Sequence, residues 1–273
     1  MAAGGGQGNC EPGGRGVRKL VRLPQGKKAL KSKMCYDTKH DGRKKCRFVV
    51  KGYSQVYGVD FDEVFSPTAK FTTIRLVLAI AAAMDLDIEG MDVDQAFVNA
   101  DLEPHEQLII EPPAGYEEYD PETGEKLYWL LEKSLYGLKQ AARNWWGDID
   151  KWFREHGFSP SGWDPCLYIG GTDENPIFVV LYVDDLLIVG RDISEFKKAI
   201  NAKYDMKELG ELTYFLGLEI QRDRAARTLK ISQGKYLRSI LERFGMAECK
   251  PKFTPAVENE YLRPASAEDM LKP

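Results

Sequence analysis

The sequence predicts an α+β fold built around an antiparallel sheet, and three observations support this class. Two apolar, β-rich runs flank a short acidic tip within residues 177–189, which is the pattern of a β-hairpin. Three amphipathic stretches elsewhere have helical spacing. Strand-like and helix-like segments also follow one another without the regular alternation of a parallel α/β sheet.

Composition allows a sizeable core and gives no membrane signal. The chain has 273 residues, 43% of them hydrophobic, which suffices for one large domain or two small ones. Its longest uncharged apolar run, Leu76 to Met84, is too short to span a bilayer, and the N-terminus lacks a signal-peptide pattern. We therefore expect an intracellular protein without a membrane partner. Five scattered cysteines with no Cys-x-x-Cys pair predict neither a disulfide framework nor a zinc site.

The N-terminal third begins with a tail and a basic hairpin. Residues 1–18 are Gly-rich and polar, so they are expected to be disordered. Residues 27–45 are typical of a basic β-hairpin with its turn at His40-Asp41-Gly42, and residues 47–50 predict a following strand.

Three helices are predicted from spacing and end signals. The first begins at a Thr72-Thr73 cap and ends near Met84. The second covers about residues 140–156 and ends before Gly157, and the third covers about residues 232–244 and ends before Gly245. Their expected apolar faces consist of Ile74, Val77, Leu78 and Ala81; of Trp145, Ile149, Trp152 and Phe153; and of Tyr236, Leu237, Ile240, Leu241 and Phe244.

Charge is distributed unevenly along the chain. The net charge is −4, but residues 1–50 contain 13 Lys or Arg and only 3 Asp or Glu. From Asp85 to Glu125 there are 14 acidic residues and no Lys or Arg. A basic arm beside an acidic segment suits a protein that holds a polyanion near a cation, although charge runs are more often simply solvated faces.

The most informative feature is the pair Asp184-Asp185 at the tip of the 177–189 hairpin. Adjacent carboxylates among apolar strands are costly unless they are hydrogen-bonded, paired or bound to a metal. Upstream, Asp92 lies in or at the end of an alternating apolar stretch, residues 86–93, so the two strands can bring Asp92 to the same groove. Carboxylates are the ligands that Mg²⁺ prefers, and two such ions can clamp both oxygens of a phosphoryl displacement. The residues thus indicate nucleotidyl transfer.

A set of ordered motifs resembles the reverse transcriptase of copia-type retrotransposons over about residues 19–256. The motifs are Lys51-Gly52-Tyr53-Ser54-Gln55, Phe65-Ser66-Pro67, Met91-Asp92-Val93, Ala96-Phe97, Ser134-Leu135-Tyr136-Gly137-Leu138-Lys139-Gln140, Tyr182-Val183-Asp184-Asp185, Phe215-Leu216-Gly217 and Arg243-Phe244-Gly245-Met246. The resemblance implies a right-hand polymerase fold with fingers, an antiparallel palm sheet and a thumb. It implies fingers and palm at 19–222, a thumb-like helical segment at 223–256 and a C-terminal tail at 257–273, with the chain ending before any ribonuclease H domain.

The resemblance also implies roles for particular residues. Asp92, Asp184 and Asp185 match the catalytic carboxylates, which hold two Mg²⁺ ions, with Mn²⁺ as a substitute and the Val93 carbonyl as a further ligand. The residues matched to the incoming dNTP are Arg47, Lys45 (or Lys44), Asp94, Gln95, Phe97 and Tyr136, with Phe97 excluding a 2′-hydroxyl. The residues matched to the template and primer are Gly137, Lys139, Tyr182, Leu216, Gly217, Lys235 and Arg238.

Simpler interpretations remain for several of these residues. Phe97 taken alone is more typical of a core position, and Arg47 of a solvated strand. Asp94 and Asp185 can be read as adding only local negative charge. The tryptophans of the second helix favour packing over base stacking. The three histidines are isolated in sequence, so none is expected to be catalytic.

Two functional hypotheses follow. The first is an RNA-directed DNA polymerase that extends a primer on an RNA or DNA template, acting beside the integrase and ribonuclease H domains of a Pol polyprotein, in a cytoplasmic virus-like particle or in the nucleus. The second is an inactive, truncated remnant that at most binds nucleic acid. The intact carboxylates favour the first, whereas the expected truncation favours the second. Departures from the family pattern such as Asp94, Ala100 and Ala142 also fit a decaying copy.

Overall fold

The computed structural model describes residues 16–38, 42, 44–103 and 105–251, and it confirms the α+β class with antiparallel sheets. The largest sheet has six strands in the order β12-β4-β11-β10-β9-β8, and every neighbouring pair is antiparallel. These strands are β4 (Asp87–Val93), β8 (Ser159–Pro160), β9 (Leu167–Gly171), β10 (Pro176–Tyr182), β11 (Asp185–Gly190) and β12 (Met206–Glu211).

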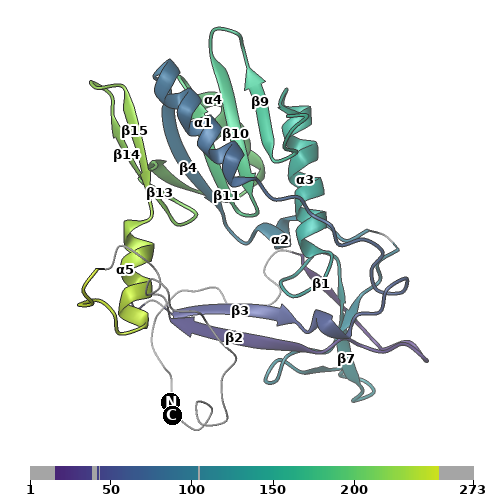
Figure 1. The fold of residues 1–273 in the computed structure, drawn as a ribbon. Coiled ribbons are helices and arrows are strands. Elements are labelled where there is room, and N and C mark those ends of the chain that lie inside the picture. The colour runs from purple at the N-terminus through teal and green to yellow at the C-terminus, as the bar shows by residue number, and fades with distance from the viewer. Residues whose placement is uncertain (1–15, 39–41, 43, 104, 252–273) are drawn as a thin grey trace.

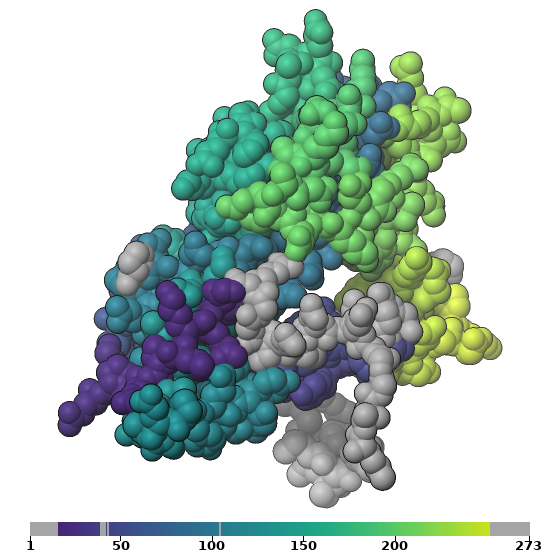
Figure 2. Space-filling view, turned by 180° about the vertical axis from the view of Figure 1, so that it is seen from behind, coloured from purple at the N-terminus to yellow at the C-terminus, as the bar shows by residue number. Residues whose placement is uncertain are grey.

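Helices cover both faces of this sheet (Figure 1). On one face, α3 (Ala141–Glu155) and α4 (Ser194–Lys203) pack against Val179, Leu181, Leu186 and Ile188. On the other face, α1 (Phe71–Met84) packs against Val180, Leu187 and Val189. Seen from behind, green atoms from the region of α4 lie at the surface between the teal atoms of the α3 region and the yellow-green atoms that follow β12 in the chain (Figure 2). The alternation of inward residues along β10 and β11 explains why both runs are apolar throughout.

Three smaller sheets complete the fold. The hairpin of β2 (Ser32–Thr38) and β3 (Lys44–Val50) lies beyond the end of the large sheet that carries the β10–β11 tip (Figure 1). A four-stranded sheet combines β1 (Arg18–Val21), β5 (Ile109–Ile110), β6 (Glu118–Tyr119) and β7 (Lys126–Leu131). The third contains β13 (Tyr214–Phe215), β14 (Leu218–Asp223) and β15 (Thr228–Ser232), and it leads to α5 (Gly234–Arg243). Two short helices, η1 (Gly52–Ser54) and α2 (Ala96–Asn99), lie in connections.

The three predicted helices are present at the predicted positions, but their ends and their burial agree only partly with the predictions. The expected inward residues of α1 and α3 are all buried. The predicted Thr72-Thr73 cap is wrong, because α1 begins at Phe71 and Asp164 accepts hydrogen bonds from Lys70 N and the Thr73 hydroxyl. The third helix is shorter than predicted, and none of its residues is buried. Its apolar stripe therefore faces solvent in this structure, with Leu237 61% exposed.

Several N-terminal predictions need correction. Val17 is buried and β1 begins at Arg18, so the expected tail extends too far; residues 1–15 lie outside the described ranges. Residues 44–50 form the second arm of the basic hairpin itself and are not a separate strand after it. The expected turn residues of this hairpin, His40 and Asp41, also lie outside the described ranges. Cys46 is disulfide-bonded, contrary to the prediction from cysteine spacing.

None of the described helices combines the length and the apolar character that crossing a bilayer would require.

Candidate active site

The register of the large sheet brings two of the predicted carboxylates side by side. β4 and β11 pair so that Asp92 lies directly opposite Asp185. Val93 N donates to the Asp184 carbonyl at 2.8 Å, so the hydrogen bonds fall on the neighbouring pair. Asp92 and Asp185 therefore form a non-hydrogen-bonded pair, in which Cα atoms approach to about 4.5 Å and side chains share one face. That face is the one covered further along by α1.

Asp184 occupies the turn between β10 and β11. Tyr182 pairs with Asp185, which leaves a two-residue loop of Val183 and Asp184. Val183 has a φ of +58°, whereas the φ of Asp184 is not positive, and this combination is the sign pattern of a type II′ turn. A left-handed backbone is unfavourable for a β-branched residue and costs on the order of 1–3 kcal/mol. The tip of the hairpin is therefore a strained turn that presents Asp184 beside the Asp92–Asp185 pair.

The electrostatics of the site favour a bound cation. Burial raises the pKa of Asp92, and the charge of Asp184 raises it further. Burial also raises the pKa of Asp185 to about 6, with the charges of Asp184 and Asp92 adding to the effect. Asp92 and Asp185 are thus harder to ionise, both because they are partly buried and because negative charges lie near them. A divalent cation would remove this repulsion and favour the ionised forms.

The donor set fits Mg²⁺, although the side chains are not yet gathered around one point. Among the described residues, no three His, Cys, Asp or Glu side chains already form a group that could hold a metal ion. The backbone brings three hard oxygen donors to one end of the sheet, and Mg²⁺ is commonly held by one or two carboxylates together with water and substrate phosphates.

Lys207 is a site residue that the sequence did not predict. It pairs with Asp92 across β12 and β4, on the side opposite Asp185, and its charge counteracts the rise in the pKa of Asp92. The strand that carries it, MKELGE, has little apolar content because it is an exposed edge strand, so it gave no strand signal.

Two of the predicted dNTP-binding residues meet beside the carboxylates. The rings of Phe97 and Tyr136 contact edge-to-face, with centroids 4.9 Å apart. Burial raises the pKa of the Tyr136 hydroxyl, Asp184, Asp94 and Asp92 add to this, and Arg47 opposes it. These charges therefore all act on the same hydroxyl.

The end of β3 is fixed against the turn that carries Tyr136. Val50 N donates to the Tyr136 carbonyl at 2.8 Å. Gly52 and Gly137 allow this approach: a Cβ on Gly52 would lie 1.9 Å from the Gly137 carbonyl, and Gly137 has a φ of +92°. The same strand carries Lys45, whose charge lowers the pKa of Asp92. The basic hairpin thus brings Arg47 and Lys45 into electrostatic range of the acidic site.

The other predicted site residues divide into two groups. Asp94 and Gln95 directly follow the carboxylate strand; Asp94 N donates to the Asp205 carbonyl at 2.9 Å, and Gln95 has a φ of +53° just before α2. Lys139 is engaged elsewhere, since its ammonium donates to the Gln55 carbonyl and lies 4.7 Å from the Phe61 ring centre. Tyr182 precedes the acidic turn and packs on the α1 side of the sheet.

The predicted primer-binding residues lie on a different part of the fold. Leu216 and Gly217 form the left-handed turn between β13 and β14. Lys235 and Arg238 lie on α5, where the Lys235 ammonium is 5.7 Å from the Tyr214 ring centre. The structure groups these residues around the β13–β14 sheet and does not give them a contact with Asp92 or Asp185 among the described interactions.

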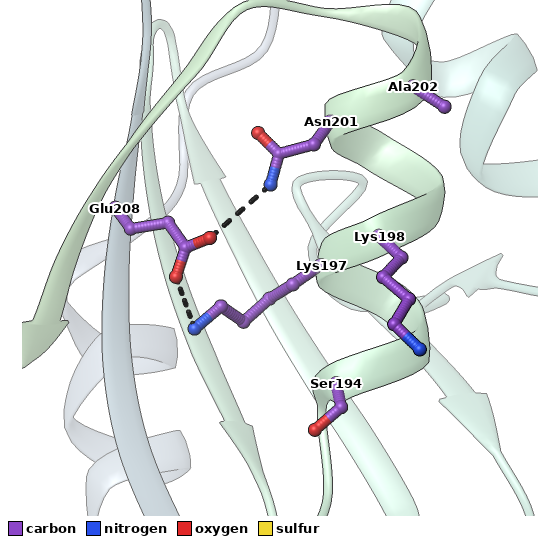
Figure 3. A pocket seen from close by; sticks show the side chains of 6 residues that line it. All are labelled: Ser194, Lys197, Lys198, Asn201, Ala202 and Glu208. Carbon is purple, nitrogen blue, oxygen red and sulfur yellow. Dashed lines mark hydrogen bonds and ion pairs between the residues drawn. The ribbon is translucent and has the colours of Figure 1, made fainter.

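A surface hollow between α4 and β12 is a poor alternative site. Figure 3 shows Lys197 and Asn201 turned toward Glu208 across it. Lys197 is paired with Glu208 and with Glu89 at 2.9 Å, so its charge is already neutralised. The hollow lies on the α4 face, whereas Asp92 and Asp185 lie on the α1 face.

Comparison with known proteins points to one family. Residues 15–258 match the family described as reverse transcriptase (RNA-dependent DNA polymerase). The chain is 44% identical over 250 residues to the retrovirus-related Pol polyprotein from transposon TNT 1-94 of Nicotiana tabacum, a match that covers 88% of this chain and 18% of that protein. It is 34% identical over 223 residues to the corresponding polyprotein from transposon RE2 of Arabidopsis thaliana, covering 81% of this chain and 15% of that protein. The chain thus spans less than a fifth of either relative.

One solved structure that resembles the chain is a foamy viral protease-reverse transcriptase in complex with double-stranded DNA. The TM-score is 0.41 at 14% sequence identity, covering 85% of this chain and 38% of that chain.

Proposed function

Because the chain belongs to the reverse transcriptase (RNA-dependent DNA polymerase) family, we propose that it is an RNA-directed DNA polymerase of a copia-type retrotransposon. The observation that carries the proposal is the pairing of Asp92 with Asp185 beside the Asp184 turn. The relatives are Pol polyproteins, so we propose that the polymerase acts next to the integrase and ribonuclease H domains of a longer protein.

In this proposal Asp92, Asp184 and Asp185, together with the Val93 carbonyl, hold two Mg²⁺ ions, for which Mn²⁺ can substitute. When bound, the ions stabilise the negative charge that develops as a primer 3′-hydroxyl displaces pyrophosphate from a dNTP. The carboxylates fix where that charge can be accommodated. The raised pKa values of Asp92 and Asp185 support this role, since carboxylates that repel one another gain most from a shared cation.

The proposed nucleotide site lies between the carboxylates and the β2–β3 hairpin. Arg47 and Lys45 would bind the triphosphate, for which the planar guanidinium fork is well suited. Phe97, held against Tyr136, would form the floor of the sugar pocket and exclude a 2′-hydroxyl. Asp94 and Gln95 would line the same pocket through their position after Asp92.

The proposed subdomains follow the sheets. We assign the six-stranded sheet with α1, α3 and α4 to the palm, and the sheets built from β1–β3 and β5–β7 to the fingers. Residues 223–256, with α5, would belong to the thumb. Gly137, Lys139 and Tyr182 would contact the template or primer near the palm, and Leu216, Gly217, Lys235 and Arg238 would contact the primer strand from the thumb side.

Primer extension on poly(rA)/oligo(dT) with dTTP and Mg²⁺ tests the proposal. The parent protein should extend the primer, and Asp184→Asn should abolish extension while retaining the melting temperature and template–primer binding, because only charge toward the metal is lost. Equal extension by both proteins would contradict the assignment. A folded parent that binds the template–primer but never extends it would instead support the inactive remnant.

A further inference from the structure

The carbonyl of Val183 has an unusual hydrogen-bond donor. Trp145 on α3 is 1% exposed, and its indole N–H donates to the Val183 carbonyl at 2.6 Å. The two residues are 38 positions apart in sequence. The contact therefore joins a helix on one face of the sheet to the turn that carries Asp184.

This carbonyl belongs to the central peptide of the turn. In a two-residue loop the hairpin is closed by the flanking residues, here Tyr182 and Asp185, so the central carbonyl has no partner in the ladder. Val183 is partly buried, and a carbonyl shielded from water without a partner is unfavourable, so Trp145 supplies the partner that the ladder does not. The indole thus satisfies an acceptor that strand pairing leaves open.

The orientation of the same peptide decides the turn type. Types I′ and II′ share a positive φ at the first loop residue and differ by a flip of the central peptide, which makes the second φ positive in type I′. Asp184 is the second loop residue, and aspartate tolerates the left-handed region better than most residues. A flip of this peptide would therefore be accessible. It would change the direction of the Cα–Cβ bond of Asp184 and so move its carboxylate.

We propose that Trp145 is a positioning residue, which holds the Val183–Asp184 peptide in the orientation that directs the Asp184 carboxylate toward Asp92 and Asp185. The expected effect of Trp145 on catalysis rests on the proposed function, since it presupposes that the chain is a polymerase. It extends that function by assigning a role to a side chain that does not itself touch the metal or the nucleotide.

The surroundings of Trp145 hold the donor in place. Its ring meets the Tyr204 ring edge-to-face, with centroids 5.2 Å apart. The Tyr204 hydroxyl donates to Asp148 at 2.9 Å, and Asp148 lies one turn further along the same helix as Trp145. Tyr204 also precedes Asp205, whose carbonyl accepts from Asp94 N. One cluster of aromatic residues thus supports both the turn and the strand end beyond Asp92.

The neighbouring tryptophan provides a matched control. Trp146 packs against the same core, but in the described part of the chain its buried indole N–H has no hydrogen-bond partner. Trp145→Phe and Trp146→Phe remove the same atoms from adjacent positions of one helix. Only the first removes a hydrogen bond to the acidic turn.

Two measurements on the full chain separate positioning from stability. We expect Trp145→Phe to weaken Mn²⁺ binding to the nucleotide-free protein, measured by electron paramagnetic resonance, by about 10- to 100-fold, as for other residues that orient metal ligands. In primer extension with Mg²⁺, kcat should fall by a similar factor while the KM for dTTP changes little. Trp146→Phe should leave Mn²⁺ affinity and kcat within about twofold of the parent. Both variants should lower the melting temperature, and Trp145→Phe should lower it more, because it also loses the hydrogen bond to Val183.

A second variant guards against misfolding of Trp145→Phe. Incorporating the benzothiophene isostere of tryptophan at position 145 replaces the N–H with sulfur and preserves the ring volume, so only the hydrogen bond is lost. Reduced Mn²⁺ affinity in this variant would support the proposal even if the phenylalanine variant does not fold. Parent-like Mn²⁺ affinity would overturn it, as would equal losses in Trp145→Phe and Trp146→Phe.

The two readouts also separate this inference from the proposed function. A parent that binds Mn²⁺ but extends no primer would contradict the polymerase assignment. A selective loss of Mn²⁺ affinity on removal of the Trp145 N–H would still support the positioning role.

Discussion

Replacing Asp185 with asparagine should stabilise the metal-free protein at neutral pH. In the parent, burial and the charges of Asp184 and Asp92 disfavour the ionised carboxylate at this position. Asparagine has nearly the same shape and no charge, so it relieves the repulsion while keeping the packing. The same change removes a proposed metal ligand and should weaken Mg²⁺ binding.

The magnitude follows from the pKa of this carboxyl. A rise from 3.8 to about 6 corresponds to at most about 3 kcal/mol. Because the Asp185 side chain is only partly buried, solvent screening reduces this upper limit. We therefore expect Asp185→Asn to gain about 1 kcal/mol in the free energy of unfolding. The sign is fixed by linkage: an acid with a raised pKa in the folded state favours folding while protonated. That contribution is complete below pH 3.8 and is lost as the pH rises through about 6.

Urea denaturation with EDTA at pH 4.5 and pH 7.5 measures the effect. Asp185→Asn should be more stable than the parent at pH 7.5, and the difference should shrink at pH 4.5. Mg²⁺ should then stabilise the parent more than the variant at pH 7.5, because a ligand that binds only the folded state raises its stability. Asp173→Asn, at an exposed position between β9 and β10, controls for loss of one negative charge. A stability difference that is zero at pH 7.5, or identical at both pH values, would refute the reasoning.

Three further outcomes are expected. Phe97→Val should raise kcat/KM for UTP relative to dTTP. Because Phe97 packs between two core clusters, the variant should also lose about 1–3 kcal/mol in the free energy of unfolding. An unchanged UTP/dTTP ratio with a lower melting temperature would indicate a core role only. Affinity for a template–primer should fall as the salt concentration rises. If Lys235 and Arg238 each contact a phosphate, Lys235→Ala or Arg238→Ala should reduce the slope of log affinity against log salt concentration by about 0.9. An unchanged slope would exclude α5 from the interface. Arg222→Ala should destabilise the protein by about 2 kcal/mol in thermal denaturation, since the side chain is 8% exposed and its guanidinium donates to the Ala81 carbonyl at 3.1 Å and to the Leu86 carbonyl. A parent-like melting temperature would contradict this.

The sequence was sufficient to predict the parts of the fold that depend on local pattern. The 177–189 hairpin was predictable because two apolar, β-rich runs flank its acidic tip, and the strand bearing Asp92 was predictable because its apolar residues alternate. The inward residues of α1 and α3 followed from helical spacing alone. The approach of Asp92 to Asp185 followed less directly, since it required the two strands to be neighbours in one sheet.

The remaining features depend on contacts between distant segments. The start of α1 was mispredicted because its cap, Asp164, is 91 residues from Thr73. Lys207 was missed because an edge strand with charged residues resembles a loop. For α5, spacing predicted only that the apolar residues share one face, and it cannot show what, if anything, covers that face.

The strained turn persists because the strands around it bury far more than the turn costs. A left-handed Val183 costs on the order of 1–3 kcal/mol. Each fully buried Val, Leu or Ile contributes roughly 1.5–3 kcal/mol, and the flanking strands contain six such residues with no exposed surface. These are Val179, Val180, Leu186, Leu187, Ile188 and Val189. The hairpin core can therefore impose the left-handed residue, but it cannot choose the orientation of the central peptide, because strand pairing is the same in either turn type. That choice requires a contact outside the hairpin, and in the described structure the Trp145 indole is placed to make it.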